Sequence, residues 1–332
     1  MKSKEALSDS HGCSRSKTAV TFACSANITR HAKQREIQRK NGGIEMNIVS
    51  LFDGISCGAV ALERAGIKIG RYAAYEIDEN AIKVSEQNYP KIERYGNVFE
   101  GEFERFAGFD MLMGGSPCTY WSIARCTSTE EKRTKKCEGP GWELFKQYKR
   151  ALDEIEPKYF IYENNASISP IIKNKISEEL GVNYLTINSR LVSAQDRRRC
   201  YWTNIPVVGM PEDREIYFRD VISRERSDMR PIGEWVHGLR FGKTKLAAMK
   251  RLDCEKSGTL TTSKYHPGNY YLNDNETEYT NLTAEEWEIL QTLPQGYTSI
   301  LSGEKRYKAI GNGWTVDVIA WILSFIPEEE RT

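Results

Sequence analysis

The first indication of the fold comes from residues 47–66, which read NIVSLFDGISCGAVALERAG. A short apolar run at 47–52 ends at Asp53-Gly54, and a helical segment at 58–65 ends at Gly66. This order is typical of a buried strand, a glycine turn and a helix. Glycines let the backbone approach a ligand, and the first N–H groups of the helix face the same space. The segment therefore predicts a ligand-binding turn.

An acidic residue follows this turn at a distance that suits a nucleotide-type cofactor. Glu76 ends the next predicted strand, 69–76, about 20 residues after the glycines. A carboxylate in that place can accept hydrogen bonds from ribose hydroxyls. The pair of features fits NAD or S-adenosylmethionine, and a tight structural turn remains the alternative.

Strand-like and helix-like segments alternate up to about residue 208. Such alternation predicts a parallel, doubly wound α/β sheet with helices on both faces. Further strands are expected at 111–114, 159–163, 184–188 and 200–203, and helices at 78–88, capped by Asp78, and at 144–155.

The alternation fails between residues 209 and 281, where Pro, Gly, Tyr, Lys, Arg and Asn dominate. Short β-like pieces remain at 259–263 and 270–272. We therefore predict a small, irregular, β-rich second domain. A helix at 284–292, with Thr283 and Glu286 as its capping box, and an apolar helix at 315–325 return the chain to the sheet. The first domain thus spans 46–208 and 282–328.

The composition excludes several classes of protein. Eight cysteines in 332 residues, none spaced Cys-x-x-Cys, indicate neither a disulfide scaffold nor a zinc ribbon. No apolar stretch approaches the roughly 20 residues of a membrane helix. We expect an intracellular, cytoplasmic protein with reduced thiols, no membrane partner and no bound metal. The net charge of +1 does not decide on a nucleic-acid partner, since a basic face can be hidden in a neutral total.

Residues 1–45 differ from the rest, with nine basic and four acidic residues against 38 and 42 elsewhere. Gly42-Gly43-Ile44-Glu45 before Met46 can be encoded by a purine-rich ribosome-binding sequence ahead of a start codon. We therefore expect translation to begin at Met46, in a bacterial or phage genome. A disordered basic extension is the alternative.

A second motif, Gly114-Gly115-Ser116-Pro117-Cys118, follows the predicted strand 111–114. The carboxyl edge of a parallel sheet is where ligands bind. A thiol there can act as a nucleophile when a base or a dipole favours the thiolate. Cys118 is therefore a candidate nucleophile, and a buried structural cysteine is the alternative.

A third motif, Glu163-Asn164-Asn165, ends the predicted strand 159–163. An acid at this edge can protonate or hydrogen-bond a heteroaromatic ring, particularly when burial raises its pKa. A carboxylate that only caps a helix is the alternative.

A fourth motif occupies residues 195–199 and reads QDRRR. Alternate residues of a strand share a face, so Arg197 and Arg199 should point together. Two parallel guanidinium groups suit a phosphate or a substrate oxygen. A solvated run of charges is the alternative.

A fifth motif, GNGWTV at 311–316, is a glycine-flanked turn before the last helix. Taken in order, the five motifs resemble those of the DNA (cytosine-5)-methyltransferases: a Phe-x-Gly turn, Pro-Cys, Glu-Asn, Gln-x-Arg-x-Arg and a terminal Gly-Asn turn. The resemblance covers about residues 47–206 and 282–325, and its motif detail is most similar to the de novo branch. It implies a Rossmann-like S-adenosylmethionine-dependent methyltransferase fold, with 209–281 as the target-recognition region.

The resemblance also implies a role for each matching residue. The Cys118 thiolate adds to C6 of cytosine, and Glu163 binds and protonates N3. Arg197 contacts the O2 side of the base, and Arg199 belongs to the same catalytic set. C5 then takes the methyl group, a base removes the C5 proton and Cys118 leaves. The cytosine must first be flipped out of double-stranded DNA, at a cost of a few kcal/mol.

The implied cofactor, S-adenosylmethionine, lies along the glycine turn, with Glu76 on the ribose and Ile77 against adenine. The expected cofactor contacts are Phe52, Asp53, Gly54, Ile55, Gly58, Glu76, Ile77, Asn97, Val98, Ser116, Pro117, Asn312, Trp314 and Val316. The expected DNA contacts are Ser122, Arg125, Gln195, Lys264, Tyr265, His266 and Asn269.

Several positions depart from the family pattern. Thr119 stands where the family has Gln, Asn165 where it has Val, and Asn97 where it has Asp. None of these changes removes Cys118 or Glu163, so we expect activity on double-stranded DNA, with a monomer as the default. A tRNA cytosine-5 methyltransferase of the same fold and a catalytically inactive DNA-binding homologue are the alternatives.

Overall fold

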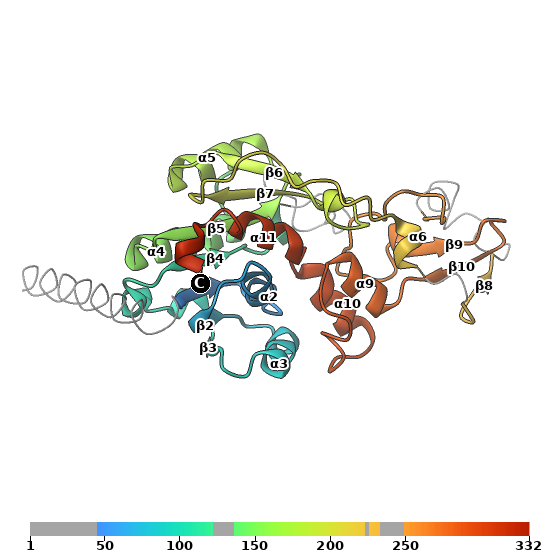
Figure 1. Ribbon diagram of the computed structural model, residues 1–332, viewed down its shortest axis with the longest axis horizontal. Helices are drawn as coiled ribbons and strands as arrows, with labels where there is room; N and C mark the ends of the chain where they lie inside the picture. Colours follow the sequence, from blue (N-terminus) through green and yellow to red (C-terminus); the bar gives the residue numbers. More distant parts are fainter. Residues whose placement is uncertain (1–44, 122–135, 223–225, 233–248, 332) are drawn as a thin grey trace, which may run out of the picture. The chain divides into compact units, whose positions relative to one another are not determined.

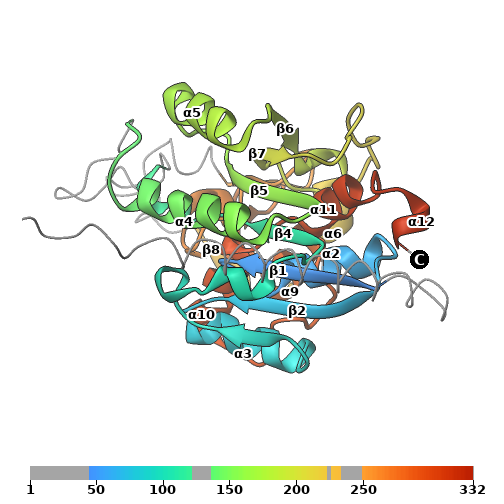
Figure 2. The same cartoon turned by 90° about the vertical axis from the view of Figure 1, so that its left-hand side faces the viewer.

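The computed structural model describes residues 45–121, 136–222, 226–232 and 249–331. Its main feature is a seven-stranded sheet in the order β3-β2-β1-β4-β5-β7-β6 (Figures 1 and 2). The strands are β1 (Met46–Leu51), β2 (Ile69–Tyr75), β3 (Glu93–Tyr95), β4 (Met111–Gly114), β5 (Tyr159–Asn165), β6 (Tyr184–Asn188) and β7 (Arg198–Thr203).

The sheet is mixed, which corrects the prediction of a parallel sheet. β1 to β5 pair in parallel, whereas β7 runs antiparallel to both β5 and β6. The reason is the short connection between β6 and β7, residues 189–197, since parallel neighbours need a crossover of a dozen or more residues. Six of the strands lie where the sequence predicts them, to within two residues at each end, whereas β3 was not predicted.

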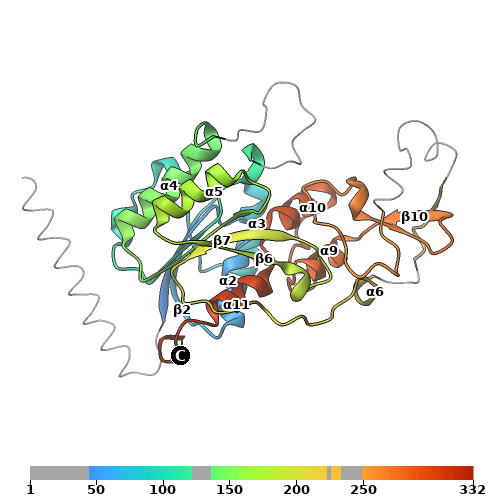
Figure 3. The ribbon, with the colours of Figure 1, turned by 90° about the horizontal axis from the view of Figure 1, so that it is seen from above.

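Helices cover both faces of the sheet, as predicted (Figure 3). Met111 and Met113 of β4 pack with the helices of one face, and Leu112 between them packs with those of the other. Successive strand residues point to opposite sides, so both faces of β4 are apolar. The first face carries α2 (Cys57–Arg64), α3 (Glu79–Asn88) and α11 (Val316–Leu323), and the second carries α4 (Pro140–Ile155) and α5 (Pro170–Leu180).

Local capping signals explain where several helices begin. The Asp78 side chain accepts a hydrogen bond from Asn80 N at the start of α3. Thr283 and Glu286 form the predicted capping box of α9 (Ala284–Leu290). Four helices were not predicted from the sequence: α5, α6 (Phe218–Val221), α10 (Gly303–Asn312) and α12 (Glu328–Arg331). The 3₁₀ helices are Val98–Glu100, Phe103–Phe106, Cys118–Tyr120, Ser189–Leu191 and Pro267–Asn269.

Between residues 209 and 281, the described residues contain a three-stranded antiparallel sheet in the order β8-β10-β9. Its strands are β8 (Arg230–Pro231), β9 (Tyr270–Leu272) and β10 (Glu278–Asn281). The strand predicted at 259–263 is absent. The Leu260 N–H donates to Gln195 Oε1 and the Leu260 carbonyl accepts from Arg197, so these backbone groups do not pair with a neighbouring strand. In the part of the chain that the structure describes, no helix is long and apolar enough to cross a membrane.

One glycine permits the close approach of residue 261 to the last turn of α10. A Cβ atom on Gly311 would lie 2.1 Å from the carbonyl oxygen of Thr261. We expect Gly311→Ala to lower the free energy of unfolding by about 2–3 kcal/mol, because two backbone segments must separate. Urea unfolding measures this. Gly96→Ala is the control, since nothing lies within 4 Å of its added Cβ, and equal effects of both changes would contradict the expectation.

Candidate active site

A cavity of about 1280 Å³ opens at the carboxyl ends of β1, β4 and β5. Its wall includes all four predicted catalytic residues, Cys118, Glu163, Arg197 and Arg199. The wall also includes ten of the predicted cofactor contacts, namely Phe52, Asp53, Gly54, Gly58, Glu76, Ile77, Ser116, Pro117, Asn312 and Trp314. The sheet therefore brings together residues that lie up to about 260 positions apart in the sequence.

The glycine turn after β1 is held open by Glu76. Both Gly54 and Phe52 have positive φ angles, of 59° and 57°. The Glu76 carboxylate accepts hydrogen bonds from the backbone N–H groups of Gly54, Ile77 and Asp78, each at 2.8 Å. A carboxylate offers about four acceptor positions, so this one can also receive a ligand hydroxyl.

Asp53, a half-buried residue of the cavity wall, also stabilises this turn. Asp53 accepts hydrogen bonds from Ser56 Oγ at 2.5 Å and from the Tyr72 hydroxyl at 2.7 Å. Burial raises the pKa of the Asp53 carboxyl, while its bonds to serine and tyrosine hydroxyls act in the opposite direction. A Cβ on Gly58 would lie 3.0 Å from the same tyrosine hydroxyl, so the glycine lets α2 start against this group.

The segment before Cys118 is fixed by two side chains of β5, Asn164 of the third motif and Tyr162, which no motif indicated. Ser116 Oγ lies 2.6 Å from the Tyr162 hydroxyl, and Asn164 Nδ2 donates to Ser116 O at 3.1 Å. Burial raises the pKa of the Cys118 thiol, and the charges of Arg199 and Arg197 act to lower it. The two arginines thus favour the thiolate in a position where burial opposes it.

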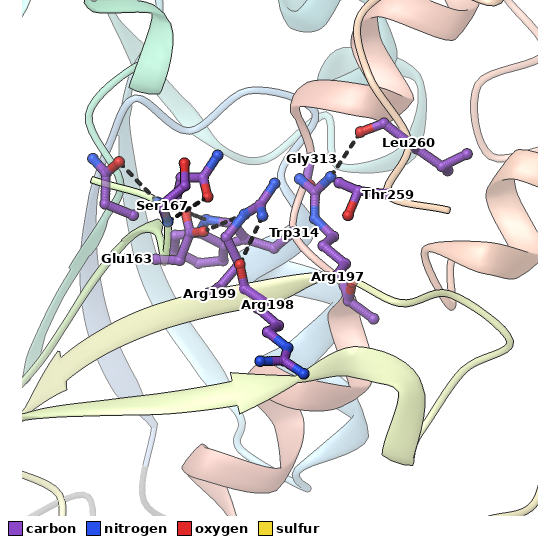
Figure 4. A network of polar contacts seen from close by, with 12 residues as sticks. Glu163, Ser167, Arg197, Arg198, Arg199, Thr259, Leu260, Gly313 and Trp314 are labelled. Carbon is purple, nitrogen blue, oxygen red and sulfur yellow. Dashed lines mark hydrogen bonds and ion pairs between the residues drawn. The ribbon is translucent and has the colours of Figure 1, made fainter. Parts of the chain in front are cut away.

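Glu163 lies at the centre of a polar network (Figure 4). Arg199 Nε is 3.1 Å from Glu163 Oε1, and Trp314 Nε1 donates to Oε2 at 3.1 Å. Burial raises the pKa of the Glu163 carboxyl, against the opposing effects of Arg199, Arg197 and Trp314. A buried acid with a raised pKa suits proton donation to a ring nitrogen.

Arg197 is placed differently from Arg199, although both line the cavity. Its guanidinium donates to the carbonyl oxygens of Leu260 at 3.1 Å, Gly311 at 3.2 Å and Gly313 at 3.0 Å. Burial, and then the charge of Arg199, lower its pKa to about 9, so it stays charged at neutral pH. The arginine that contacts Glu163 is therefore Arg199, while Arg197 bonds to three carbonyl groups in two backbone segments, at 260 and at 311–313.

Two predicted DNA contacts are buried, which corrects those assignments. Gln195 is fully buried, donates to Leu290 O at 2.9 Å and accepts from Leu260 N at 3.0 Å. Asn269 is also fully buried and donates to Ser263 O at 2.9 Å. Neither side chain reaches a surface that a duplex can touch, so both hold loops in place.

The other predicted DNA contacts lie in different places. His266 lines the cavity, Tyr265 is exposed, and the Lys264 ammonium lies 5.0 Å from the centre of the Tyr265 ring. Ser122 and Arg125 lie outside the described residues.

Four predicted cofactor contacts do not belong to the cavity wall. Asn97 caps a 3₁₀ helix by accepting from Phe99 N at 3.1 Å. Ile55, Val98 and Val316 are buried in the core. All four remain predicted cofactor contacts.

Sequence reasoning also missed cationic residues of the cavity wall, namely Lys173, Arg198, Lys305 and Lys308. Lys308 Nζ donates to Asp78 Oδ2 at 2.8 Å, which joins α10 to the start of α3. The available signal was spacing, because Lys308 and Asn312 share one face of a helix. Within the described ranges, no group of His, Cys, Asp and Glu side chains could hold a metal ion.

Solved structures share this fold. A methyltransferase of Entamoeba histolytica, EhMeth, superposes with a TM-score of 0.68 at 15% identity and covers 85% of this chain and 98% of that one. Dnmt2 of S. pombe superposes with a TM-score of 0.63 at 17% identity, over 84% and 97% of the two chains. At these sequence identities the similarity shows only that the fold is shared.

Sequence comparison identifies the family. The orphan methyltransferase M.Rho11sI of Bacillus phage rho11s is 30% identical over 195 residues, 58% of this chain and 35% of that protein. The type II methyltransferase M.Sau96I of Staphylococcus aureus is 31% identical over 190 residues, 53% and 40% of the two chains. The chain thus spans about half the length of such relatives, or less. Residues 46–205, which include the glycine turn, Cys118, Glu163 and Arg199, match the model of the C-5 cytosine-specific DNA methylases, and this part of the chain belongs to that family.

Proposed function

We propose that this chain transfers a methyl group from S-adenosylmethionine to C5 of a cytosine in double-stranded DNA. The observation that carries the proposal is one cavity lined by a thiol, a buried acid and an arginine beside a glycine turn. Cys118 supplies the nucleophile, Glu163 the proton, and Arg199 the charge that favours the thiolate.

The chemistry follows from these groups. The Cys118 sulfur forms a bond to C6, and the ring electrons move to C5 while N3 takes a proton held by Glu163. The bound cofactor supplies an electrophilic methyl group to C5. A base, water in the simplest case, then removes the C5 proton. The ring double bond re-forms, the bond between sulfur and C6 breaks, and N3 returns its proton to Glu163. Arg199 stays beside Glu163 throughout and orients its carboxyl group.

The cavity has room for both reactants. Pockets for single small ligands measure about 300–1,000 Å³, and this one measures about 1280 Å³. The cofactor fits the end formed by Phe52, Glu76 and Ile77, where an exposed Ile77 can lie against an adenine ring. An extruded base fits the end formed by Cys118 and Glu163.

We further propose that the region 209–281 recognises the DNA sequence and that Lys264, Tyr265 and His266 face the duplex. Ser122 and Arg125 remain proposed contacts of the same kind. The phage and bacterial relatives favour a bacterial or phage setting, and hence action on DNA in the bacterial cytoplasm, with a monomer as the simplest active species.

The cofactor assignment predicts a loss of affinity in Glu76→Ala. The change removes a ribose acceptor and leaves the backbone N–H groups of Gly54, Ile77 and Asp78 without their carboxylate. We expect the Kd for S-adenosylmethionine to rise by at least about tenfold, as for the loss of one hydrogen bond to a charged group. Isothermal titration calorimetry measures it. Glu86→Ala, on an exposed position of α3, is the matched control, and equal affinity in the two variants would argue against a cofactor role for Glu76.

The function itself is tested by bisulfite sequencing of DNA from cells that express the full chain or its Cys118→Ala variant. Protected cytosines in one short sequence context, absent in the variant, are expected. Unprotected DNA from cells with folded wild-type protein would overturn the proposal. Methylated tRNA in the same cells would then point to the RNA-directed alternative, and its absence to an inactive homologue.

A further inference from the structure

Trp314 lies in the turn between α10, which ends at Asn312, and α11, which begins at Val316. Its half-buried indole lines the cavity, and its Nε1 donates to Glu163 Oε2 at 3.1 Å. Since Arg199 holds the other carboxylate oxygen, each oxygen of Glu163 has a donor from a different segment (Figure 4).

The space around this hydrogen bond is tight. A Cβ on Gly115 would lie 2.9 Å from Glu163 Oε2 and 3.3 Å from Trp314 Nε1. The indole and the carboxylate thus meet directly over the backbone of the turn that leads to Cys118. A residue with any side chain at position 115 would push them apart, so the glycine preserves the contact.

The backbone on both sides of Trp314 is also fixed. Gly313 O accepts hydrogen bonds from Arg197 at 3.0 Å and from Gln291 Nε2 at 2.9 Å. Thr315 Oγ1 donates to Gln291 Oε1 at 2.9 Å. The indole is therefore presented to Glu163 by a preorganised turn rather than by a free side chain.

We propose that Trp314 is a positioning residue for Glu163, whose indole N–H holds the carboxyl group in the orientation needed for proton transfer to the flipped base. This inference rests on the proposed function and adds to the predicted cofactor contact of Trp314. It gives the terminal Gly-Asn-Gly-Trp turn a direct part in the chemistry of the base.

The contact has a measurable consequence for titration. An N–H donor stabilises the ionised carboxylate, so its removal should raise the pKa of Glu163. The proposed reaction needs Glu163 protonated and Cys118 ionised. A carboxyl group loses its proton at a lower pH than a thiol does, so the acid limb of the bell-shaped rate profile reports Glu163 and the alkaline limb reports the thiol. The titratable and charged groups that interact with Glu163 come from several elements. They are Arg199, Cys200 and Tyr201 on β7, Arg197 just before β7, Cys118 after β4 and Tyr162 on β5, and the indole of Trp314 adds its hydrogen bond.

The test is Trp314→Phe in the full chain, assayed by single-turnover methyl transfer across pH. We expect the acid limb to move to higher pH by about one unit and the rate on the plateau to fall by about tenfold. The alkaline limb should stay in place. Trp321→Phe is the control, because Trp321 lies on α11 and packs against Phe325, outside the cavity wall. An acid limb that Trp314→Phe leaves unmoved would overturn the inference.

A second measurement does not depend on turnover. The fluorescence of Trp314, obtained as the difference between wild type and Trp314→Phe, should titrate with Glu163, and Glu163→Gln should abolish that titration. If wild type does not methylate DNA but the titration is present, the proposed function fails and the contact stands. If the difference signal does not titrate in a folded protein, the inference about Trp314 fails.

Discussion

Replacement of Cys118 by alanine is expected to reduce methyl transfer by on the order of 10⁴-fold or more, as the loss of a covalent nucleophile does in other enzymes. C5 of cytosine is a poor nucleophile until a group has added at C6. Glu163 and Arg199 remain in the variant, but they act on a base that is no longer activated. Affinity for S-adenosylmethionine should change by less than about threefold, because Cys118 acts in the chemical step and is not an expected cofactor contact.

The measurement is single-turnover transfer to a cytosine-containing duplex, with Cys254→Ala as the matched control. Cys254 is only partly buried and lies outside the cavity wall. A duplex with 5-fluorocytosine gives a second readout, because C5 then carries no proton to remove and the bond between Cys118 and C6 should persist through denaturation. Transfer by Cys118→Ala within about tenfold of wild type, or a trapped complex in that variant, would refute the assignment.

The parts of the site that sequence could predict are those encoded by short segments. The order of strand, glycine turn and helix at 47–66 is local, and the structure contains it with boundaries shifted by one residue. Cys118 and Glu163 were identified because each lies at the carboxyl end of a strand of the predicted parallel sheet, which is the edge where ligands bind. The capping side chains Asp78 and Thr283 were predicted for the same reason, since each bonds to a backbone group two or three residues away.

The parts that sequence could not predict depend on partners far along the chain. The rule that alternate strand residues share a face predicted that Arg197 and Arg199 point together, and both line the cavity, as does Arg198 between them. It could not reveal that Arg197 meets carbonyl groups 63 or more residues away, whereas Arg199 meets Glu163. The DNA contact predicted for Gln195 was wrong for the same reason. A polar residue in a basic motif gives no sign in the sequence that its side chain is buried.

That difference between the two arginines leads to a prediction about stability. Arg197→Leu is expected to lower the free energy of unfolding by about 4 kcal/mol, a large part of the 5–15 kcal/mol typical of a folded protein. Leu260 O and Gly311 O each lose a charged donor, while Gly313 O keeps Gln291. Removal of a buried charge, whose pKa burial lowers to about 9, offsets part of the loss. The cost of leaving two buried carbonyl groups without a donor exceeds this gain, because leucine has no hydrogen-bond donor.

The measurement is urea unfolding of both Arg197→Leu and Arg198→Leu. Arg198 precedes its neighbour Arg199 on β7 and is exposed, so its replacement should change stability by less than about 0.5 kcal/mol. Arg197→Leu should also slow methyl transfer, because Gly313 and hence the Trp314 turn lose one of their anchors. If Arg197→Leu were as stable as Arg198→Leu and lost only activity, Arg197 would have to act on the substrate, and the reading of it as a link between backbone segments would be wrong.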